Sequence, residues 1–146
     1  MVARPKDYRE LIVWQKAMAL ARTAYAVTAK LPKSEAYGLH AQIRRAAVSI
    51  PSNIAEGHGR LTDSQFRHFF GNARGSIYEL RTQFELGADL GFIDQQSLRQ
   101  LMEQSAEVTR LINGLLASLR TELGDRPFAS SANTANSASS ARKGLR

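Results

Sequence analysis

The chain of 146 residues contains no cysteine, so it has neither a disulfide framework nor a thiolate metal site. No stretch approaches the roughly 18 apolar residues of a membrane span, and no signal-peptide core follows residues 1–9. Nowhere do polar and apolar residues alternate as in a half-buried strand. These absences predict a single all-α domain that is cytoplasmic and makes no contact with a membrane.

The net charge of +7 is concentrated at the two ends of the chain. Arg4 and Lys6 contribute +2 and the residues after 124 contribute +3, which leaves +2 for residues 7–124. The high isoelectric point is therefore only weak support for nucleic-acid binding by the folded domain.

Four segments have the apolar spacing of amphipathic helices, at about residues 7–30, 34–57, 62–88 and 94–121. Each begins at a residue suited to cap a helix, namely Asp7, Ser34, Thr62 and Asp94. Their short connections favour an antiparallel up-down-up-down four-helix bundle over residues 7–123. Residues 1–6 are then an N-terminal extension, and the Ala/Ser-rich residues 124–146 are predicted to form a disordered tail.

The first predicted helix has two apolar stripes, although one is enough for a bundle core. One stripe consists of Leu11, Trp14, Met18, Ala21, Tyr25 and Thr28. The other consists of Val13, Ala17, Leu20, Ala24, Val27 and Leu31. The second stripe either widens the core face or packs against another subunit.

Pro51 lies inside the second predicted helix, where it lacks a backbone donor and crowds the carbonyl of Ala47. We expect a kink there, with Ser52 and Asn53 satisfying freed backbone groups. Gly57 and Gly59 are predicted to supply the stop of this helix.

Two glycines one turn apart, Gly71 and Gly75, lie inside the third predicted helix. A glycine in a helix interior permits close approach of a neighbouring backbone. Ala46 and Ala47 of the second helix are the expected partners.

Six arginines are the candidate nucleic-acid contacts. Arginine donors spaced along a helix can follow a phosphate backbone, but they also form solvated faces or pair with carboxylates of another subunit. No aromatic residues are interleaved with them, so any binding should depend on charge and shape. Four of them recur every seven residues and two are adjacent on the second helix: Arg60, Arg67, Arg74, Arg81, and Arg44 with Arg45.

No catalytic or metal signature stands out. His40, His58 and His68 have neither zinc spacing nor the Glu-x-x-His spacing of di-iron bundles. Glu56 with His58 is the best alternative for an enzyme or small-ligand site, although a salt bridge is the simpler role for Glu56. We expect a non-catalytic protein with no metal and no cofactor.

The first three predicted helices contain several distinct motifs in a fixed order. They are LIVWQKA at 11–17, YGL at 37–39, QIRRAAVSIPSNIAEG at 42–57, then Phe69, Ala73, Gly75-Ser76 and Glu79-Leu80. Over about residues 8–120 this pattern resembles the four-helix-bundle family of the 23S rRNA-intervening sequence protein. Its structural signature here comprises Ser49, Pro51, Ser52, Asn53, Glu56 and Gly57.

The resemblance implies a four-helix bundle that assembles into a homopentameric ring. A distantly related branch, the accessory variability determinant of diversity-generating retroelements, binds nucleic acid through a basic ring surface. One hypothesis is therefore a non-catalytic, oligomeric accessory protein that binds RNA or DNA. The alternative is a protein–protein interaction scaffold, favoured by the extra apolar stripe and the low charge of residues 7–124.

Overall fold

The computed structural model describes residues 5–35 and 38–122, and this part of the chain is entirely helical between its turns. None of these helices combines the length and apolar character that a membrane span requires. The predicted tail at 124–146 lies outside the described residues. In chain order the elements are η1 (Tyr8–Glu10), α1 (Ile12–Thr28), η2 (Lys33–Glu35), α2 (Leu39–His58), α3 (Asp63–Asp89) and α4 (Gln95–Glu122), where η marks a 3-10 helix.

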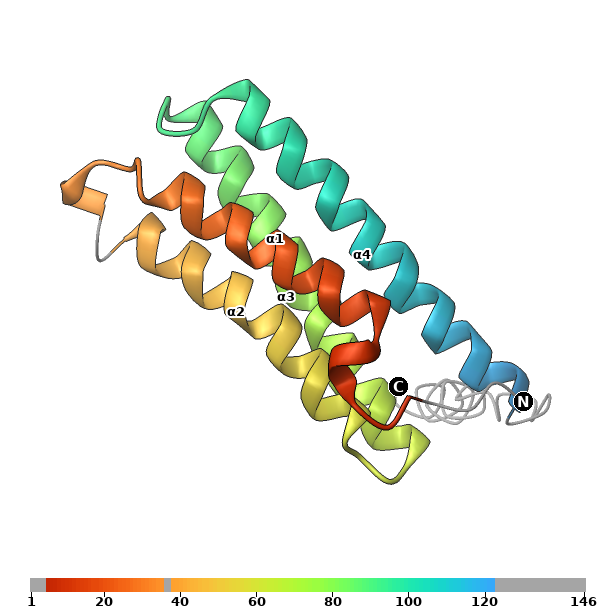
Figure 1. The fold of residues 1–146 in the computed structure, drawn as a ribbon. Coiled ribbons are helices and arrows are strands. Elements are labelled where there is room, and N and C mark those ends of the chain that lie inside the picture. Colours follow the sequence, from red (N-terminus) through yellow and green to blue (C-terminus); the bar gives the residue numbers. More distant parts are fainter. Residues whose placement is uncertain (1–4, 36–37, 123–146) are drawn as a thin grey trace, which may run out of the picture.

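The four α-helices lie side by side around one apolar core (Figure 1). α1 contacts α2 and α4, and α3 contacts the same two helices, so the four close around a common interior. Each helix buries its apolar stripe, as the spacing predicts. The largest fully buried side chains include Leu20, Ile43, Ile50, Ile54, Phe70, Ile77, Leu80, Phe84, Leu101 and Ile112.

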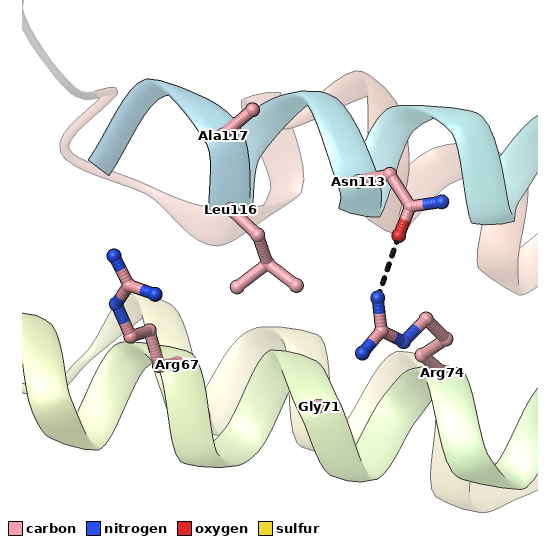
Figure 2. Close-up of a pocket in the computed structure, with 6 residues that line it drawn as sticks. All are labelled: Arg67, Gly71, Arg74, Asn113, Leu116 and Ala117. Carbon is pink, nitrogen blue, oxygen red and sulfur yellow. Dashed lines mark hydrogen bonds between the residues drawn. The ribbon is translucent and has the colours of Figure 1, made fainter. Parts of the chain in front are cut away.

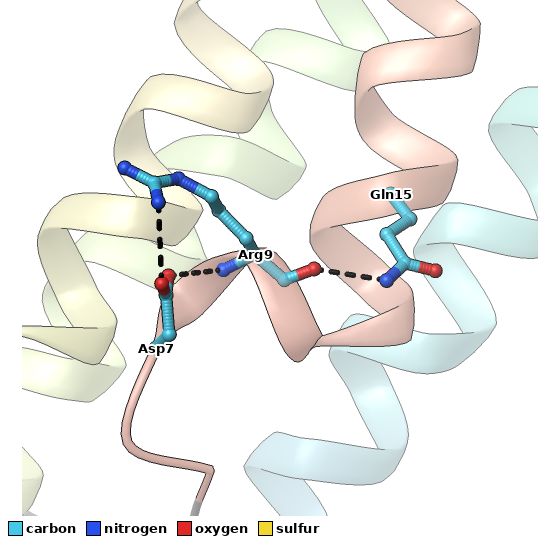
Figure 3. Close-up of polar contacts among 3 residues, drawn as sticks. All are labelled: Asp7, Arg9 and Gln15. Atoms are coloured by element: carbon cyan, nitrogen blue, oxygen red, sulfur yellow. Dashed lines mark hydrogen bonds and ion pairs between the residues drawn. The ribbon is translucent and has the colours of Figure 1, made fainter.

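α1 begins five residues later than predicted, because Asp7 caps a separate short turn (Figure 3). Asp7 Oδ1 accepts a hydrogen bond from the backbone N–H of Arg9 at 2.9 Å, which starts η1. Leu11 is then extended, with φ −70° and ψ 123°, and separates η1 from α1. Gln15 donates to the carbonyl of Arg9 at 2.8 Å and holds this turn against the helix.

α2 likewise begins later than predicted. Ser34 lies in η2 and does not cap α2, which begins at Leu39 after Gly38. At α1 the cause is local, because Asp7 caps a 3-10 turn in place of the α-helix.

α3 and α4 begin at the capping residues predicted from the sequence. Thr62 Oγ1 accepts from the N–H of Gln65 at 3.2 Å, and Asp94 Oδ1 accepts from the N–H of Ser97 at 2.7 Å. These bonds satisfy donors that the first turn leaves free.

α3 is followed by a left-handed glycine, Gly91, whose φ is +80°. The N–H of Phe92 donates to the carbonyl of Gly87 at 2.9 Å, and that of Gly91 donates to Ala88 at 3.0 Å. This pair of bonds is a Schellman motif.

α2 continues through Pro51, which is buried. The side-chain amide of Asn53 donates to the carbonyl of Ser49 at 2.8 Å. The acceptor that Pro51 leaves free belongs to Ala47, so the predicted compensation by Asn53 is wrong. The predicted kink stays a prediction.

The close approach of α2 and α3 occurs at Gly57, which was expected to end the helix. α2 runs on to His58, with Gly59 at its C-cap. A Cβ on Gly57 would lie 2.9 Å from Cβ of Phe69 and 3.0 Å from the ring of Phe70. A side chain there would force the two helices apart.

Gly71 and Gly75 do not support the expected approach of Ala46 and Ala47. A Cβ at either glycine would meet nothing within 4 Å among the described atoms. Each costs about 1 kcal/mol of helix stability relative to alanine. Packing within the described part of the chain does not account for that cost.

Candidate nucleic-acid interface

Arg44 acts as a structural link between α1 and α2. Its Nε donates to Thr28 Oγ1 at 3.0 Å, and a terminal nitrogen donates to the carbonyl of Tyr25 at 3.3 Å. The guanidinium also lies over the ring of Tyr25, 4.3 Å from its centroid. Because its Nε and one terminal nitrogen already bond to α1, Arg44 has fewer donors left for a phosphate than a free arginine.

Arg60 and Arg81 are also partly committed. Arg60 pairs with Glu56 at 2.9 Å and lies over the ring of Phe69, 4.6 Å from its centroid. Arg81 Nε contacts the sulfur of Met102 at 3.2 Å, which joins α3 to α4. The seven-residue repeat therefore contains arginines in different environments.

Arg45 is exposed on α2. Within the described chain it makes no hydrogen bond or ion pair. It lies on α2 and does not line the α3–α4 groove described below.

Arg67 and Arg74 line a groove between α3 and α4 (Figure 2). The groove has a volume of about 380 Å³. Arg74 donates to Asn113 Oδ1 at 2.9 Å, which orients its guanidinium across the helix pair. Six residues line this α3–α4 groove: Arg67, Gly71 and Arg74 from α3, and Asn113, Leu116 and Ala117 from α4.

The described lining of the α3–α4 groove carries two positive charges, those of Arg67 and Arg74. No carboxylate occurs among its described lining residues, and Arg67 has no hydrogen bond or ion pair with any described side chain. Asp63 lies one turn before Arg67, outside the lining. The two arginines are seven residues apart, which places their Cα atoms about 10 Å apart along the helix. Two half-exposed guanidiniums at this spacing can hold an anion or an anionic chain.

A second, apolar groove lies between α1 and α2, with a volume of about 410 Å³. Tyr25 and Val48 leave 40% and 45% of their surface exposed. The structure thus distinguishes the two stripes of α1: the stripe of Val13 and Leu20 forms the core, and the other is only partly covered. The lining of this α1–α2 groove is Met18, Ala21, Arg22, Tyr25, Val48, Pro51 and Ser52.

Two of the signature residues, Ser49 and Gly57, lie at the contact between α2 and α3. Ser49 Oγ and Ser76 Oγ are 2.8 Å apart, and Asn53 donates to Ser49 Oγ at 2.9 Å. Ser52 is exposed at the α1–α2 groove, and Glu56 pairs with Arg60. Ser49 and Asn53 of this signature therefore have a structural role.

The alternative site at Glu56 and His58 gains no chemical support from its geometry, because Glu56 is exposed and paired. Among the described residues, no group of three or more His, Asp or Glu is placed to hold a metal ion. The pKa of Asp94, at the start of α4, is lowered, mainly by the hydrogen bond from the backbone N–H of Ser97. A side-chain hydrogen bond with Tyr8, followed by the charge of Asp7, raises the pKa of Arg9.

Sequence reasoning missed the α4 side of the α3–α4 groove. In the sequence, Asn113 is a polar residue within the apolar run around Ile112 and Leu115. This interruption was the one sequence feature that could have indicated a polar contact on α4. Its partner Arg74 is 39 residues away, a pairing that a helical period does not reveal.

Comparison with known families matches residues 9–114 to the 23S rRNA-intervening sequence protein. The chain belongs to this family. No curated protein matches it. Among solved structures, it is similar to a protein of unknown function from the S23 ribosomal protein family of Bacteroides thetaiotaomicron, at 19% identity and a TM-score of 0.65. That match covers 72% of this chain and 98% of the other, and at this identity it shows the shared fold alone.

Proposed function

We propose that this member of the 23S rRNA-intervening sequence protein family is a non-catalytic accessory protein that binds RNA or DNA through its α3–α4 groove. One observation carries the proposal: Arg67 and Arg74 face an open groove with no carboxylate among its described lining residues. Of the six candidate arginines, these two are the centre of the proposed interface, because they line the same groove and Arg44, Arg45, Arg60 and Arg81 do not.

We further propose that the helices form an antiparallel up-down-up-down bundle and that the bundles assemble in the cytoplasm as a homopentameric ring. The closed order of helix contacts supports the bundle topology, and the partly exposed stripe of α1 supports a subunit contact. The number five comes from the resemblance. A ring would repeat a weak site several times and raise overall avidity without new contacts.

The test is fluorescence anisotropy with labelled RNA and DNA, single-stranded and duplex, across a salt series. We compare the full chain, a chain ending at Leu123, and the double variant Arg67→Ser/Arg74→Ser. Removing two phosphate contacts should weaken binding and reduce the logarithmic salt slope by about 1.4 for single strands. Binding retained by the shortened chain places the site on residues 1–123.

The matched control is Lys33→Ser/Arg99→Ser, which removes the same charge from two exposed positions that line neither groove. It should retain most of the affinity. If both double variants lose affinity equally, the interaction depends on net charge and the assignment to this groove is wrong. Unchanged affinity after Arg67→Ser/Arg74→Ser also contradicts it.

The apolar α1–α2 groove favours a second function, a protein–protein interaction scaffold. A polypeptide partner would bury Tyr25 and Val48 there. Pull-down from nuclease-treated lysate with wild type and Val48→Glu separates the two functions. A partner retained after nuclease treatment and lost with Val48→Glu supports the scaffold, whereas material lost to nuclease supports nucleic-acid binding.

A further inference from the structure

We infer that the α3–α4 groove seats one nucleotide step of a single strand, with its two flanking phosphates on Arg67 and Arg74. This inference rests on the proposed function and adds to it the form of the nucleic acid and the way it enters. It makes Gly71, which carries no charge, as important for binding as the arginines.

The charges of the groove match a phosphate–sugar–phosphate unit. Arg67 and Arg74 stand at its two ends, and the Leu116 side chain points into the space between them (Figure 2). A guanidinium can present two parallel donors to one phosphate. Asn113 accepts from a single terminal nitrogen of Arg74, so the other donors of that guanidinium stay available to a ligand.

Gly71 provides the room between the two arginines. It lines the groove, and the position of its absent Cβ has nothing within 4 Å among the described atoms. The volume of about 380 Å³ is in the range of small-molecule sites and suits a nucleotide-sized group. A duplex is far wider and would touch only the rim.

The described lining contains no aromatic residue, so bases have no stacking platform inside the groove. The contact should therefore follow the strand backbone and show little preference between bases. This agrees with the charge-led binding that the sequence predicts.

The experiment compares Gly71→Leu with Gly75→Leu. Both variants replace a glycine of α3 that has open space around it with a strong helix former, so both should raise the melting temperature. Only Gly71 lines the groove. Gly71→Leu fills the seat without changing charge, whereas Gly75→Leu is the matched control one turn further on.

The readout is anisotropy of a labelled, unstructured single-stranded RNA, a single-stranded DNA and a duplex of equal length, with melting followed by circular dichroism. We expect Gly71→Leu to bind single strands at least about tenfold more weakly. The leucine side chain would keep a phosphate from its charged hydrogen bond with an arginine, and loss of one such bond has about this effect on affinity. Gly75→Leu should bind like wild type. Weaker binding by a variant that melts higher cannot be explained by unfolding.

The other outcomes are equally informative. If Gly71→Leu binds single strands like wild type, or if both variants weaken equally, the nucleotide seat is wrong while nucleic-acid binding stands. If wild type binds the duplex but not single strands, the strand assignment is wrong and the proposed function stands. If wild type binds none of the probes, both proposals are wrong.

Discussion

Gly57 shows how one missing side chain can determine helix packing. The atom that would oppose its Cβ at 2.9 Å is Cβ of Phe69, which is fixed to the α3 backbone. No rotamer change relieves such a contact, so the helix axes themselves would have to shift. Gly75 on α3 has the opposite environment, with open space around it.

Alanine substitutions at these two glycines should therefore change stability in opposite directions. Gly57→Ala should destabilise the fold by about 1–2 kcal/mol, because overpacking outweighs the gain in helix propensity. Gly75→Ala should stabilise it by up to about 1 kcal/mol. Urea unfolding of both variants measures the difference, and a Gly57→Ala variant as stable as wild type would show that α2 and α3 separate easily.

Sequence reasoning succeeded at this scale where the signal was local. Thr62 and Asp94 cap their helices as predicted because a cap depends on residues within one turn. Gly57 was assigned the wrong role because its reason for being glycine lies on another helix. The same holds for Arg44, whose partners Tyr25 and Thr28 belong to α1.

At the scale of one element, Asp94 links the start of α4 to pH. Its carboxylate accepts the backbone N–H of Ser97, and this bond favours the charged form and lowers the pKa of Asp94. A carboxyl group whose pKa is lower in the folded than in the unfolded state stabilises the fold above its unfolded pKa. That contribution is lost as the pH falls through the folded pKa.

Asp94→Asn separates this contribution from other carboxylates, because its amide oxygen can accept the same bond at every pH. We expect the melting temperature of wild type to fall more than that of Asp94→Asn on acidification below about pH 4, the ordinary aspartate range. Parallel melting curves from neutral to acidic pH would contradict a role for the charged cap.

The elements themselves were largely predictable, and the surfaces between them were not. Apolar periodicity identified four helices because each buries one stripe. It also placed Arg67 and Arg74 on one face of α3. It could not show that Asn113 and Leu116 complete a groove there, because that depends on how α4 is rotated against α3.

At the scale of the whole molecule, the two grooves use different helix pairs. The cationic groove belongs to α3 and α4, and the apolar one belongs to α1 and α2. The proposed subunit contacts and the proposed nucleic-acid contacts would therefore use different surfaces. A change at the apolar groove should alter assembly and leave each single nucleic-acid site intact.

Pro51 provides a test of this separation because it is buried in α2 and lines the apolar groove. Pro51→Ala restores a backbone donor toward Ala47 and removes the ring from the groove wall. We expect the variant to stay folded, as measured by circular dichroism, and to change its mass in light scattering. Pro32→Ala, at an exposed position before η2, is the control. An unaltered mass and stability for Pro51→Ala would show that this proline is incidental.

The turn between α2 and α3 has a practical consequence. Leu61 is 99% exposed there, so its side chain adds almost nothing to the hydrophobic free energy of folding. Exposed turns of this kind are where chains tolerate cleavage and inserted sequence. A fluorophore, an epitope or a protease site placed at Leu61 would report on the intact protein while leaving the lining of both grooves unchanged.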